Sequence, residues 1–232
     1  MGILYDFINL VFPKVCPACG ELLVRNERVI CYRCLYHLPR TDFHLKEDNP
    51  VAQMFWGRVL LEHAASYCLF QKGSRIRRLI HALKYGGNQE IGEELGRQFG
   101  YELKPTVFSN AELVIPGPLS KRKKRKRGFN QSECIARGLA QALEKPLNTT
   151  ALIRSRHTRT QTSRSRYERW LNVEHSFVVA NPGEIAQKHI LLVDDVVTTG
   201  ATIEACASEL LAVPGTKVSA VTLAVTLKYT SY

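Results

Sequence analysis

The spacing of apolar and polar residues predicts an α/β fold, most clearly near the C-terminus. Four apolar residues, Ile190–Val193, run into Asp194 and Asp195. After a short Thr/Gly turn, apolar or small residues at positions 203, 206, 207, 210 and 211 have the spacing of an amphipathic helix. Pro214-Gly215 ends that helix, and Val218–Val225 is a second β-type run. Parallel sheets are built from such strand–helix–strand units.

Upstream segments add further predicted elements. Apolar runs predict strands at Ala64–Phe70 and Glu112–Pro116. Helical spacing predicts a helix from Ser74, its N-cap, to Lys84, with Gly86-Gly87 just beyond its end. Taken alone, Lys84 is interpreted as a solvated cation at that helix end. The inward positions of a second helix are Ile91, Leu95 and Phe99.

Three other segments have weaker patterns. Asn130, with Glu133 three residues later, has the form of a capping box and begins a helix that stops before Pro146. Thr41–Glu62 shows no clear period and is predicted to be a linker with a short helix. The first residues have helical spacing and predict a short docking helix that ends at Pro13.

Composition is that of a globular protein, with 45% hydrophobic residues in 232. No apolar run approaches the roughly 18 residues of a membrane span. The N-terminus has Asp6 and no early Lys or Arg, which does not fit a signal peptide. We therefore expect a cytoplasmic protein with reduced thiols. Three of the seven cysteines lie in apolar segments and are predicted to be buried small residues: Cys68, Cys134 and Cys206.

The formal charge of +11 is concentrated in two segments. Lys121–Arg127 is seven basic residues in a row, and Arg154–Arg169 holds six Arg against Glu168. The rest of the chain has a net charge of −1. We expect two cationic loops on a near-neutral protein, a distribution suited to phosphates of a small ligand or of nucleic acid.

The remaining cysteines form two C-x-x-C pairs separated by eleven residues. Four thiolates at this spacing predict a closed, structural zinc site, although disulfides or unrelated free thiols are alternatives. Gly20 permits the tight knuckle turn after the second cysteine. The chain divides into an N-terminal helix plus zinc-ribbon module at 1–45 and an α/β domain at 46–232. The predicted ligands are Cys16, Cys19, Cys31 and Cys34.

The acid pair and the turn after it suggest a ligand site. In a parallel sheet, ligands bind at the carboxyl ends of strands, where Asp194 and Asp195 fall. Backbone N–H groups and three hydroxyls in Thr198–Thr202 form a small anion cup at a helix start. The site thus offers carboxylates for a diol and a nest for a monophosphate. The alternative is an acid pair that merely caps a strand end.

The two basic segments also have alternative interpretations. Lys121–Arg127 lies between a strand end and a helix start, where it suits an anion, but a solvated run or a nonspecific nucleic-acid patch fits as well. In the polar stretch Ala151–Asn172, three side chains are placed to grip a phosphate if this loop closes, unless it is a basic tether. These three are Gln161, Arg166 and Arg169.

Together these motifs resemble a known family. VDDVVTTGAT resembles the phosphoribosyl-diphosphate (PRPP) signature of type I phosphoribosyltransferases. The cysteine quartet, LKYGG, IPGPLS with its basic continuation, RGFNQ and the Arg-rich stretch occur in the order typical of the ComF family of bacterial competence-type proteins. The resemblance covers nearly the whole chain. It implies a type I phosphoribosyltransferase-like, Rossmann-like parallel-sheet core with a small N-terminal zinc-ribbon module.

The resemblance also implies roles for particular residues. Asp194 and Asp195 would hold the ribose hydroxyls, with Mg²⁺ bridging ribose and pyrophosphate, and Arg154–Asn172 would be the closing flexible loop. Gly117 stands where the family more often has Val. The implied 5′-phosphate residues are Thr198, Thr199, Gly200, Ala201 and Thr202. The implied pyrophosphate loop is Pro116, Gly117, Pro118, Leu119 and Ser120, continued by basic residues to Arg127.

Two functions remain open at this point. The first is a glycosyltransferase that moves phosphoribosyl from PRPP to an acceptor. The acceptor is given only as an amine or a nucleobase, because no segment of the sequence identifies it. Asp195 is then a weak candidate for a general base. The second is a non-catalytic competence or DNA-processing factor that binds PRPP or a nucleotide together with single-stranded DNA or partner proteins.

Overall fold

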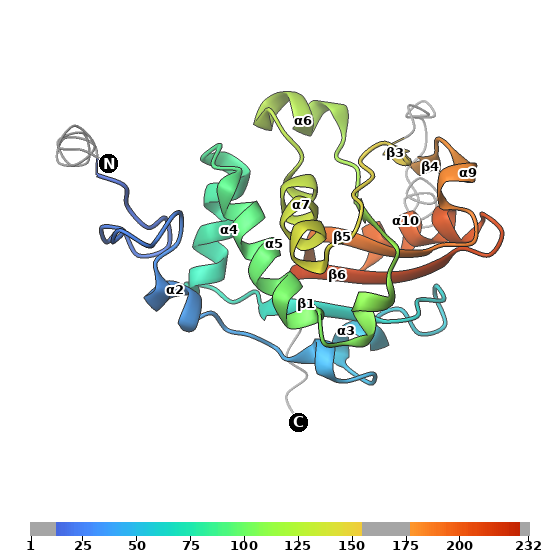
Figure 1. Cartoon of the computed structure of the whole chain (residues 1–232), viewed down its shortest axis with the longest axis horizontal. Helices are drawn as coiled ribbons and strands as arrows, with labels where there is room; N and C mark the ends of the chain where they lie inside the picture. Colours follow the sequence, from blue (N-terminus) through green and yellow to red (C-terminus); the bar gives the residue numbers. More distant parts are fainter. Residues whose placement is uncertain (1–12, 155–176, 228–232) are drawn as a thin grey trace, which may run out of the picture.

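A four-stranded parallel sheet forms the centre of the molecule (Figure 1). The structure is a computed structural model that describes residues 13–154 and 177–227. The strand order is β1-β6-β5-β2, and each neighbouring pair is parallel. The inner strands are covered on both faces, which explains their continuous apolar runs. The strands are β1 (Ala64–Leu69), β2 (Leu113–Pro116), β5 (His189–Val197) and β6 (Lys217–Val225).

Helices cover both faces of this sheet. Alternate residues of β5 enter two separate hydrophobic clusters, Leu191 and Val193 in one and Ile190 and Leu192 in the other. The first cluster contains the inward residues of three helices: α4 (Arg75–Tyr85), α5 (Glu90–Leu103) and α7 (Gln131–Leu143). The second contains residues of α3 (Pro50–Gln53) and α10 (Ala201–Leu211).

Helices α5 and α7 approach closely because glycines lie at their contact. A Cβ on Gly96 would come within 2.1 Å of the Ile135 carbonyl oxygen. A Cβ on Gly138 would come within 2.0 Å of the Glu93 carbonyl oxygen. Both distances are far below van der Waals contact, so a larger residue at either position would force the helices apart. Packed in this way, α7 has its N-terminus at the carboxyl edge of the sheet.

The N-terminal segment packs against the sheet. The Thr41 N–H donates to the Tyr67 carbonyl over 3.1 Å, and the Leu69 N–H donates to the Pro39 carbonyl over 2.8 Å. In 41–62, a short helix is confirmed, but the prediction of a linker is wrong because Val51 and Phe55 are each 1% exposed. The helical pieces here are α2 (Tyr32–Tyr36), η1 (Phe43–Leu45) and α3.

The seven-residue basic run is a helix, α6 (Lys121–Arg127), which corrects the prediction of a loop. The Ser120 hydroxyl caps its start by accepting from the Lys123 N–H over 3.3 Å. Gly128 ends it with a φ of 83°, the left-handed conformation usual after a helix. Lys and Arg are good helix formers, and because none of the seven is buried, water screens their repulsion.

Most other elements agree with the sequence. The predicted strands at 64–70, 112–116 and 218–225 and the four predicted helices beyond residue 70 are confirmed. The strand that begins at residue 189 is longer than expected and includes both acids. The predicted helix before Pro13 lies outside the described residues. The remaining elements are η2 (Val107–Asn110), α9 (Pro182–Ile185) and an antiparallel pair, β3 (Leu152–Arg154) with β4 (Phe177–Val179).

Candidate functional site

Two acids occupy the carboxyl end of β5, and both are half-buried. The Asp194 carboxylate accepts a hydrogen bond from the Ser132 hydroxyl over 2.8 Å and from the Asp195 N–H over 2.9 Å. Burial, and then the neighbouring Asp195 charge, raise the pKa of Asp194 to about 6. Carboxylate oxygens are the donors that Mg²⁺ prefers, so this pair fits a magnesium ion as well as a diol.

Lys84, at the C-terminal end of α4, contacts the acid pair directly. Its Nζ lies 2.7 Å from Oδ2 of Asp195, and the two side chains are only 20% and 16% exposed. The interpretation of Lys84 as a solvated cation is therefore wrong. The sequence did predict that α4 ends near Gly86, and therefore that Lys84 lies in the last turn of this helix. The pairing itself is a tertiary contact that the local pattern does not contain.

The turn between β5 and α10 carries the predicted phosphate-binding residues. Thr198, Thr199 and Thr202 are exposed, whereas Gly200 is buried with a φ of 81°. That left-handed conformation suits Gly and lets the chain turn from strand to helix within three residues. The N–H groups of the first turn of α10 have no partner within the helix and lie at its positive dipole end, which favours an anion.

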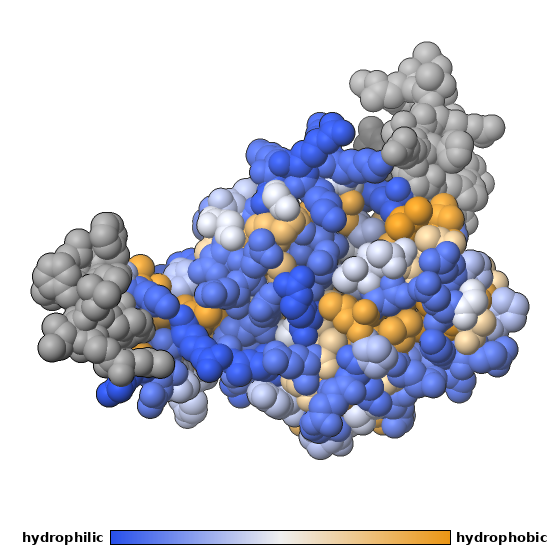
Figure 2. Space-filling view, turned by 45° about the horizontal axis from the view of Figure 1, so that its top comes forward, coloured by the Kyte–Doolittle hydropathy of each residue, from blue (hydrophilic) through white to orange (hydrophobic). Residues whose placement is uncertain are grey.

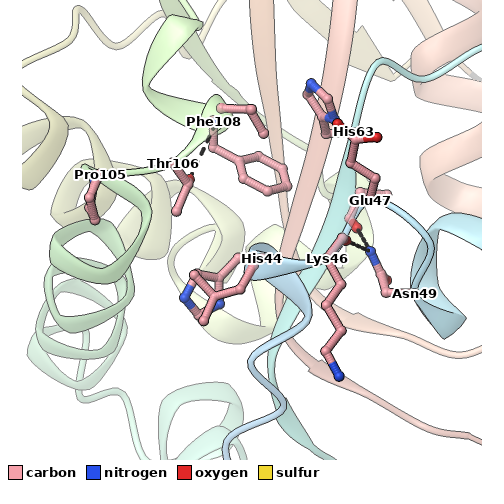
Figure 3. Close-up of a pocket in the computed structure, with 11 residues that line it drawn as sticks. His44, Lys46, Glu47, Asn49, His63, Pro105, Thr106 and Phe108 are labelled. Atoms are coloured by element: carbon pink, nitrogen blue, oxygen red, sulfur yellow. Dashed lines mark hydrogen bonds between the residues drawn. The ribbon is translucent and has the colours of Figure 1, made fainter.

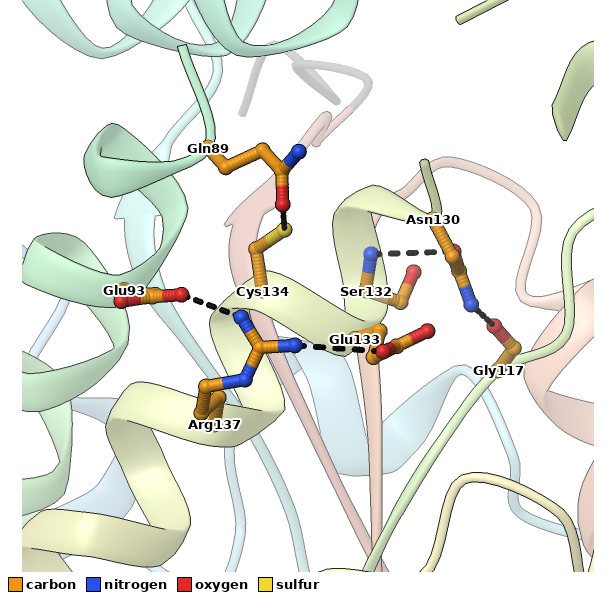
Figure 4. Close-up of polar contacts among 8 residues, drawn as sticks. All are labelled: Gln89, Glu93, Gly117, Asn130, Ser132, Glu133, Cys134 and Arg137. Atoms are coloured by element: carbon orange, nitrogen blue, oxygen red, sulfur yellow. Dashed lines mark hydrogen bonds and ion pairs between the residues drawn. The ribbon is translucent and has the colours of Figure 1, made fainter. Parts of the chain in front are cut away.

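The predicted pyrophosphate loop begins beside the acid pair. Pro116 is in register with Val193, and the Gly117 N–H donates to the Val193 carbonyl over 2.8 Å. The Gly117 carbonyl accepts from the Asn130 side chain over 3.0 Å (Figure 4). The structure thus brings the start of this loop and Asp194 together.

The N-terminus of α7 links the loop to the acids. Asn130 also accepts from the Ser132 N–H over 3.3 Å, so the predicted N-cap is confirmed. The predicted reciprocal half of the capping box is not among the bonds of the described residues, because Glu133 pairs with Arg137 over 3.3 Å instead (Figure 4). Ser132 is a site residue that sequence reasoning missed. Its contact with Asp194 joins positions 62 residues apart.

Arg127, the last residue of α6, turns back toward this region. Its Nη1 donates to the Gln131 side-chain oxygen over 2.7 Å, and its guanidinium lies 5.4 Å from the centroid of the Tyr85 ring. Arg127 is thereby held between α7 and α4. The rest of α6 projects from the molecule, where Figure 2 shows strongly hydrophilic surface at the top of the view.

A four-cysteine cluster lies far along the chain from these acids. The four sulfur atoms all lie within 4.8 Å of one another, and the Cys19 and Cys31 sulfurs are 3.7 Å apart. Four sulfurs at about 2.3 Å from a tetrahedral zinc are about 3.8 Å apart, so the geometry fits the ion. Gly20 has the expected left-handed φ of 81°. The cluster consists of Cys16, Cys19, Cys31 and Cys34.

A cavity of about 300 Å³ lies at the other edge of the sheet. It is lined by His44, His63 and Phe108, among others, near Ala64 at the amino end of β1 (Figure 3). The acid pair lies at the carboxyl end of β5, parallel to β1, so this cavity is separate from the candidate site.

Some predicted site residues lie outside the described part of the chain. These are Gln161, Arg166 and Arg169 of the predicted flexible loop. The described strands β3 and β4 flank that segment. Among the described residues, no helix is long and apolar enough to cross a bilayer.

Comparison with known proteins identifies the family. The model of the phosphoribosyl transferase domain matches residues 130–230, which include the acid pair and the turn after it. The DNA utilization protein YhgH of Escherichia coli O157:H7 is 30% identical to this chain over 202 residues. The alignment covers 85% of this chain and 84% of the YhgH chain. Competence protein ComFC of Bacillus subtilis is 30% identical over 199 residues, which cover 85% of this chain and 78% of the ComFC chain.

Among solved structures, glutamine PRPP amidotransferase from B. subtilis aligns with a TM-score of 0.43 and 19% identity, over 62% of this chain and 30% of that one. Family membership rests on the family model and on the two curated relatives. The parallel sheet agrees with the fold that the sequence predicted. The chain belongs to the ComF family of proteins with a type I phosphoribosyltransferase domain.

Proposed function

We propose that this protein binds PRPP with Mg²⁺ at the carboxyl edge of its sheet and transfers the phosphoribosyl group to an amine or nucleobase. The observation that carries the proposal is the order of groups along strand β5, the turn after it and helix α10. The strand carries two half-buried acids near its end, and the turn, which suits an anion, begins three residues after the second acid. A diol and a monophosphate are the two ends of a ribose 5-phosphate, so spacing and chemistry both suit this ligand.

In this proposal each group of residues has a role. Asp194 and Asp195 hold the ribose hydroxyls, and the Thr198–Thr202 turn receives the 5′-phosphate. Pro116–Ser120 and Arg127 face the pyrophosphate. Lys84 holds the Asp195 carboxylate in place. Bound Mg²⁺ would neutralise charge that develops on the leaving pyrophosphate.

Transfer breaks the bond between ribose C1 and a pyrophosphate oxygen and forms a bond from C1 to the acceptor nitrogen, which loses a proton. The chain would contribute positive charge around the leaving group and a fixed position for the ribose. Asp195 is paired with Lys84, so we assign it to holding the ribose rather than to removing the acceptor's proton.

The four cysteines are proposed to bind one structural zinc ion. Four thiolates leave no open position for a substrate, which favours a structural role. In the described part of the N-terminal module, residues 13–45, the helical pieces are only α2 and η1, so the metal would supply much of its folding energy. Removing it with a strong chelator should lower the thermal stability of the N-terminal module.

Pyrophosphate release from PRPP tests catalysis. It should be measured with Mg²⁺ across the nucleobases and ammonia, for wild type and for the double variant Asp194→Asn/Asp195→Asn. We expect release with at least one acceptor in wild type and none in the variant. If PRPP binds but no acceptor causes release, the transferase part of the proposal is contradicted.

A second candidate function is favoured by α6, a helix of seven cations next to the proposed pyrophosphate loop, six of them exposed and Arg127 partly buried. In this version the protein binds single-stranded DNA without catalysis. Relatives named as a DNA utilization protein and a competence protein support a link to DNA uptake. Fluorescent oligonucleotide should then bind at low salt and compete with PRPP. No oligonucleotide binding at low salt contradicts this candidate.

A further inference from the structure

Arg58, in the segment between α3 and β1, reaches the turn between β5 and α10. Its Nη1 donates to the Thr199 carbonyl over 2.9 Å and to the Met54 carbonyl over 2.8 Å. Its Nη2 donates to the Glu204 carboxylate in the first turn of α10. One guanidinium thus joins three groups from two parts of the chain. Arg58 and Thr199 are 141 residues apart in the sequence.

The same segment also packs against Gly200. A Cβ on Gly200 would come within 2.8 Å of the Phe55 ring, and Phe55 itself is only 1% exposed. The turn therefore rests on an aromatic ring on one side, while Arg58 holds the carbonyl just before that glycine. No other residue type fits Gly200 without moving the ring or straining its φ of 81°.

This segment is itself firmly attached to the domain. The Asn49 side chain, 2% exposed, donates to the carbonyls of Lys46 and Ala64, both over 2.9 Å (Figure 3). Its oxygen accepts from the Val51 N–H over 2.9 Å and so caps α3. Because Ala64 begins β1, Asn49 fixes α3 to the sheet. Phe55 and Arg58 follow directly from that anchored helix.

The contacts of Arg58 determine how the turn presents its N–H groups. No peptide bond in residues 13–154 and 177–227 is cis, and in a trans peptide the carbonyl and the following N–H point in opposite directions. Since Arg58 holds the Thr199 carbonyl, the Gly200 N–H points away from Arg58. Arg58 also pairs with Glu204, whose negative charge in the first turn of α10 would otherwise repel an anion.

We propose that Arg58 is a positioning residue for the 5′-phosphate. It orients the Thr199–Gly200 peptide so that its N–H faces the phosphate, and it masks the charge of Glu204. This inference rests on the proposed function, because it assumes that the turn receives a phosphate. Arg58 acts through the turn and through Glu204, and its bonds to them leave it no role as the main phosphate ligand.

Binding of the two halves of the ligand tests this role. Ribose 5-phosphate and inorganic pyrophosphate should each be titrated with Mg²⁺ into the full-length wild type and Arg58→Ala. We expect Arg58→Ala to weaken ribose 5-phosphate binding by roughly 10- to 100-fold while pyrophosphate binding is unchanged. A loss of both affinities together, or of neither, overturns the proposal.

Two further variants separate positioning from general damage. Glu204→Gln in the Arg58→Ala background should recover part of the ribose 5-phosphate affinity, because it removes the unmasked charge. Arg137→Ala is the matched control. It removes an Arg that also has carboxylate partners, Glu93 and Glu133, and it should leave both affinities unchanged. No recovery in the double variant contradicts charge masking.

Amide hydrogen exchange keeps the inference testable if no ligand binds. Arg58→Ala should increase exchange of the Glu204 amide, which donates to the Gly200 carbonyl over 2.9 Å, without ligand, while the amides of β6 keep their wild-type protection. If wild type binds neither ribose 5-phosphate nor PRPP, the proposed function fails, yet exchange still decides whether Arg58 holds the turn. Unchanged exchange of the Glu204 amide means that it does not.

Discussion

The two loops of the proposed site follow neighbouring strands, yet they are held in different ways. The phosphate turn passes from β5 to α10 in three residues and is fixed by packing on Phe55 and by Arg58. The pyrophosphate loop after β2 is held at Gly117, which bonds to Val193 and Asn130, and again, among the described residues, only at Arg127, which bonds to Gln131. It then runs into the exposed helix α6.

This difference teaches where the site should tolerate change. The phosphate end is bounded by buried groups and a left-handed glycine, so small changes there should be costly. The pyrophosphate end depends on hydrogen bonds and on exposed charge, which water and salt weaken. Binding of the two ligand halves should therefore respond differently to mutation and to ionic strength.

The sharpest test of the comparison is a pair of glycine substitutions. Gly200→Val requires a side chain in a left-handed conformation and within 2.8 Å of the Phe55 ring. We expect a loss of about 2–4 kcal/mol in unfolding free energy and at least a 100-fold loss of ribose 5-phosphate affinity. Denaturant unfolding and calorimetric titration measure the two effects.

Gly117→Val is the matched partner. A Cβ there would lie 3.5 Å from the Val193 carbonyl oxygen, an ordinary contact. We expect a loss of less than about 1 kcal/mol, because neither strain nor a clash arises. Equal damage from the two substitutions would show that the loops do not differ as described.

The next largest effect is expected at Lys84. Lys84→Met leaves the half-buried Asp195 carboxylate without its cation, beside the Asp194 carboxylate. We expect a loss of about 2 kcal/mol in stability at pH 7 and weaker PRPP binding, with Lys84→Arg as the conservative control. Wild-type stability and affinity in Lys84→Met would contradict a role for this ion pair.

The raised pKa of Asp194 leads us to expect that the stability of the protein changes with pH. Its pKa is raised to about 6 in the folded protein, above the ordinary value near 4, so folding favours the protonated form. Its contribution to stability is complete below pH 4 and is lost as the pH rises through about 6. Asp194→Asn should therefore match wild type near pH 4 and exceed it by about 2 kcal/mol near pH 7.5.

Thermal unfolding across this pH range measures the difference between the two proteins. Asp195→Asn is the companion variant, because removing its charge should lower the Asp194 pKa toward the ordinary value. A constant difference between Asp194→Asn and wild type from pH 4 to pH 7.5 would rule out the raised pKa.

The smallest predicted effect concerns Asn130. Asn130→Ala removes the cap of α7 and the hydrogen bond to the Gly117 carbonyl. We expect a loss of about 1 kcal/mol in stability and a several-fold loss of pyrophosphate affinity, while ribose 5-phosphate binding stays within twofold. Titration with each half-ligand decides this, and a loss confined to ribose 5-phosphate would reverse the assignment of the two loops.

The sequence predicted those parts of the fold whose signals are local. The unit from β5 to β6 was predicted because both strands are continuous apolar runs and because Pro214-Gly215 marks the helix end. The acid pair was located by its position after the first apolar run. The cysteine cluster followed from spacing, and the structure brings its four sulfur atoms together.

The missed features depend on contacts between distant segments. Arg58 lies in a stretch without periodicity, and its partners Thr199 and Glu204 are more than 140 residues away. Ser132 is an ordinary helix residue until tertiary packing brings it to Asp194. Helix α6 was missed for another reason. Its charge run suggested a loop, although Ser120 and Gly128 supplied a start and a stop signal.

The central claim, that the β5–α10 edge binds PRPP through its acid pair, is tested most directly by calorimetric titration of PRPP with Mg²⁺. The proteins are wild type, the double variant Asp194→Asn/Asp195→Asn, and Arg137→Ala as the control. We predict one binding site in wild type and in Arg137→Ala, and at least a 100-fold weaker affinity in the double variant. Equal binding by the double variant, or no binding by wild type, would contradict the claim.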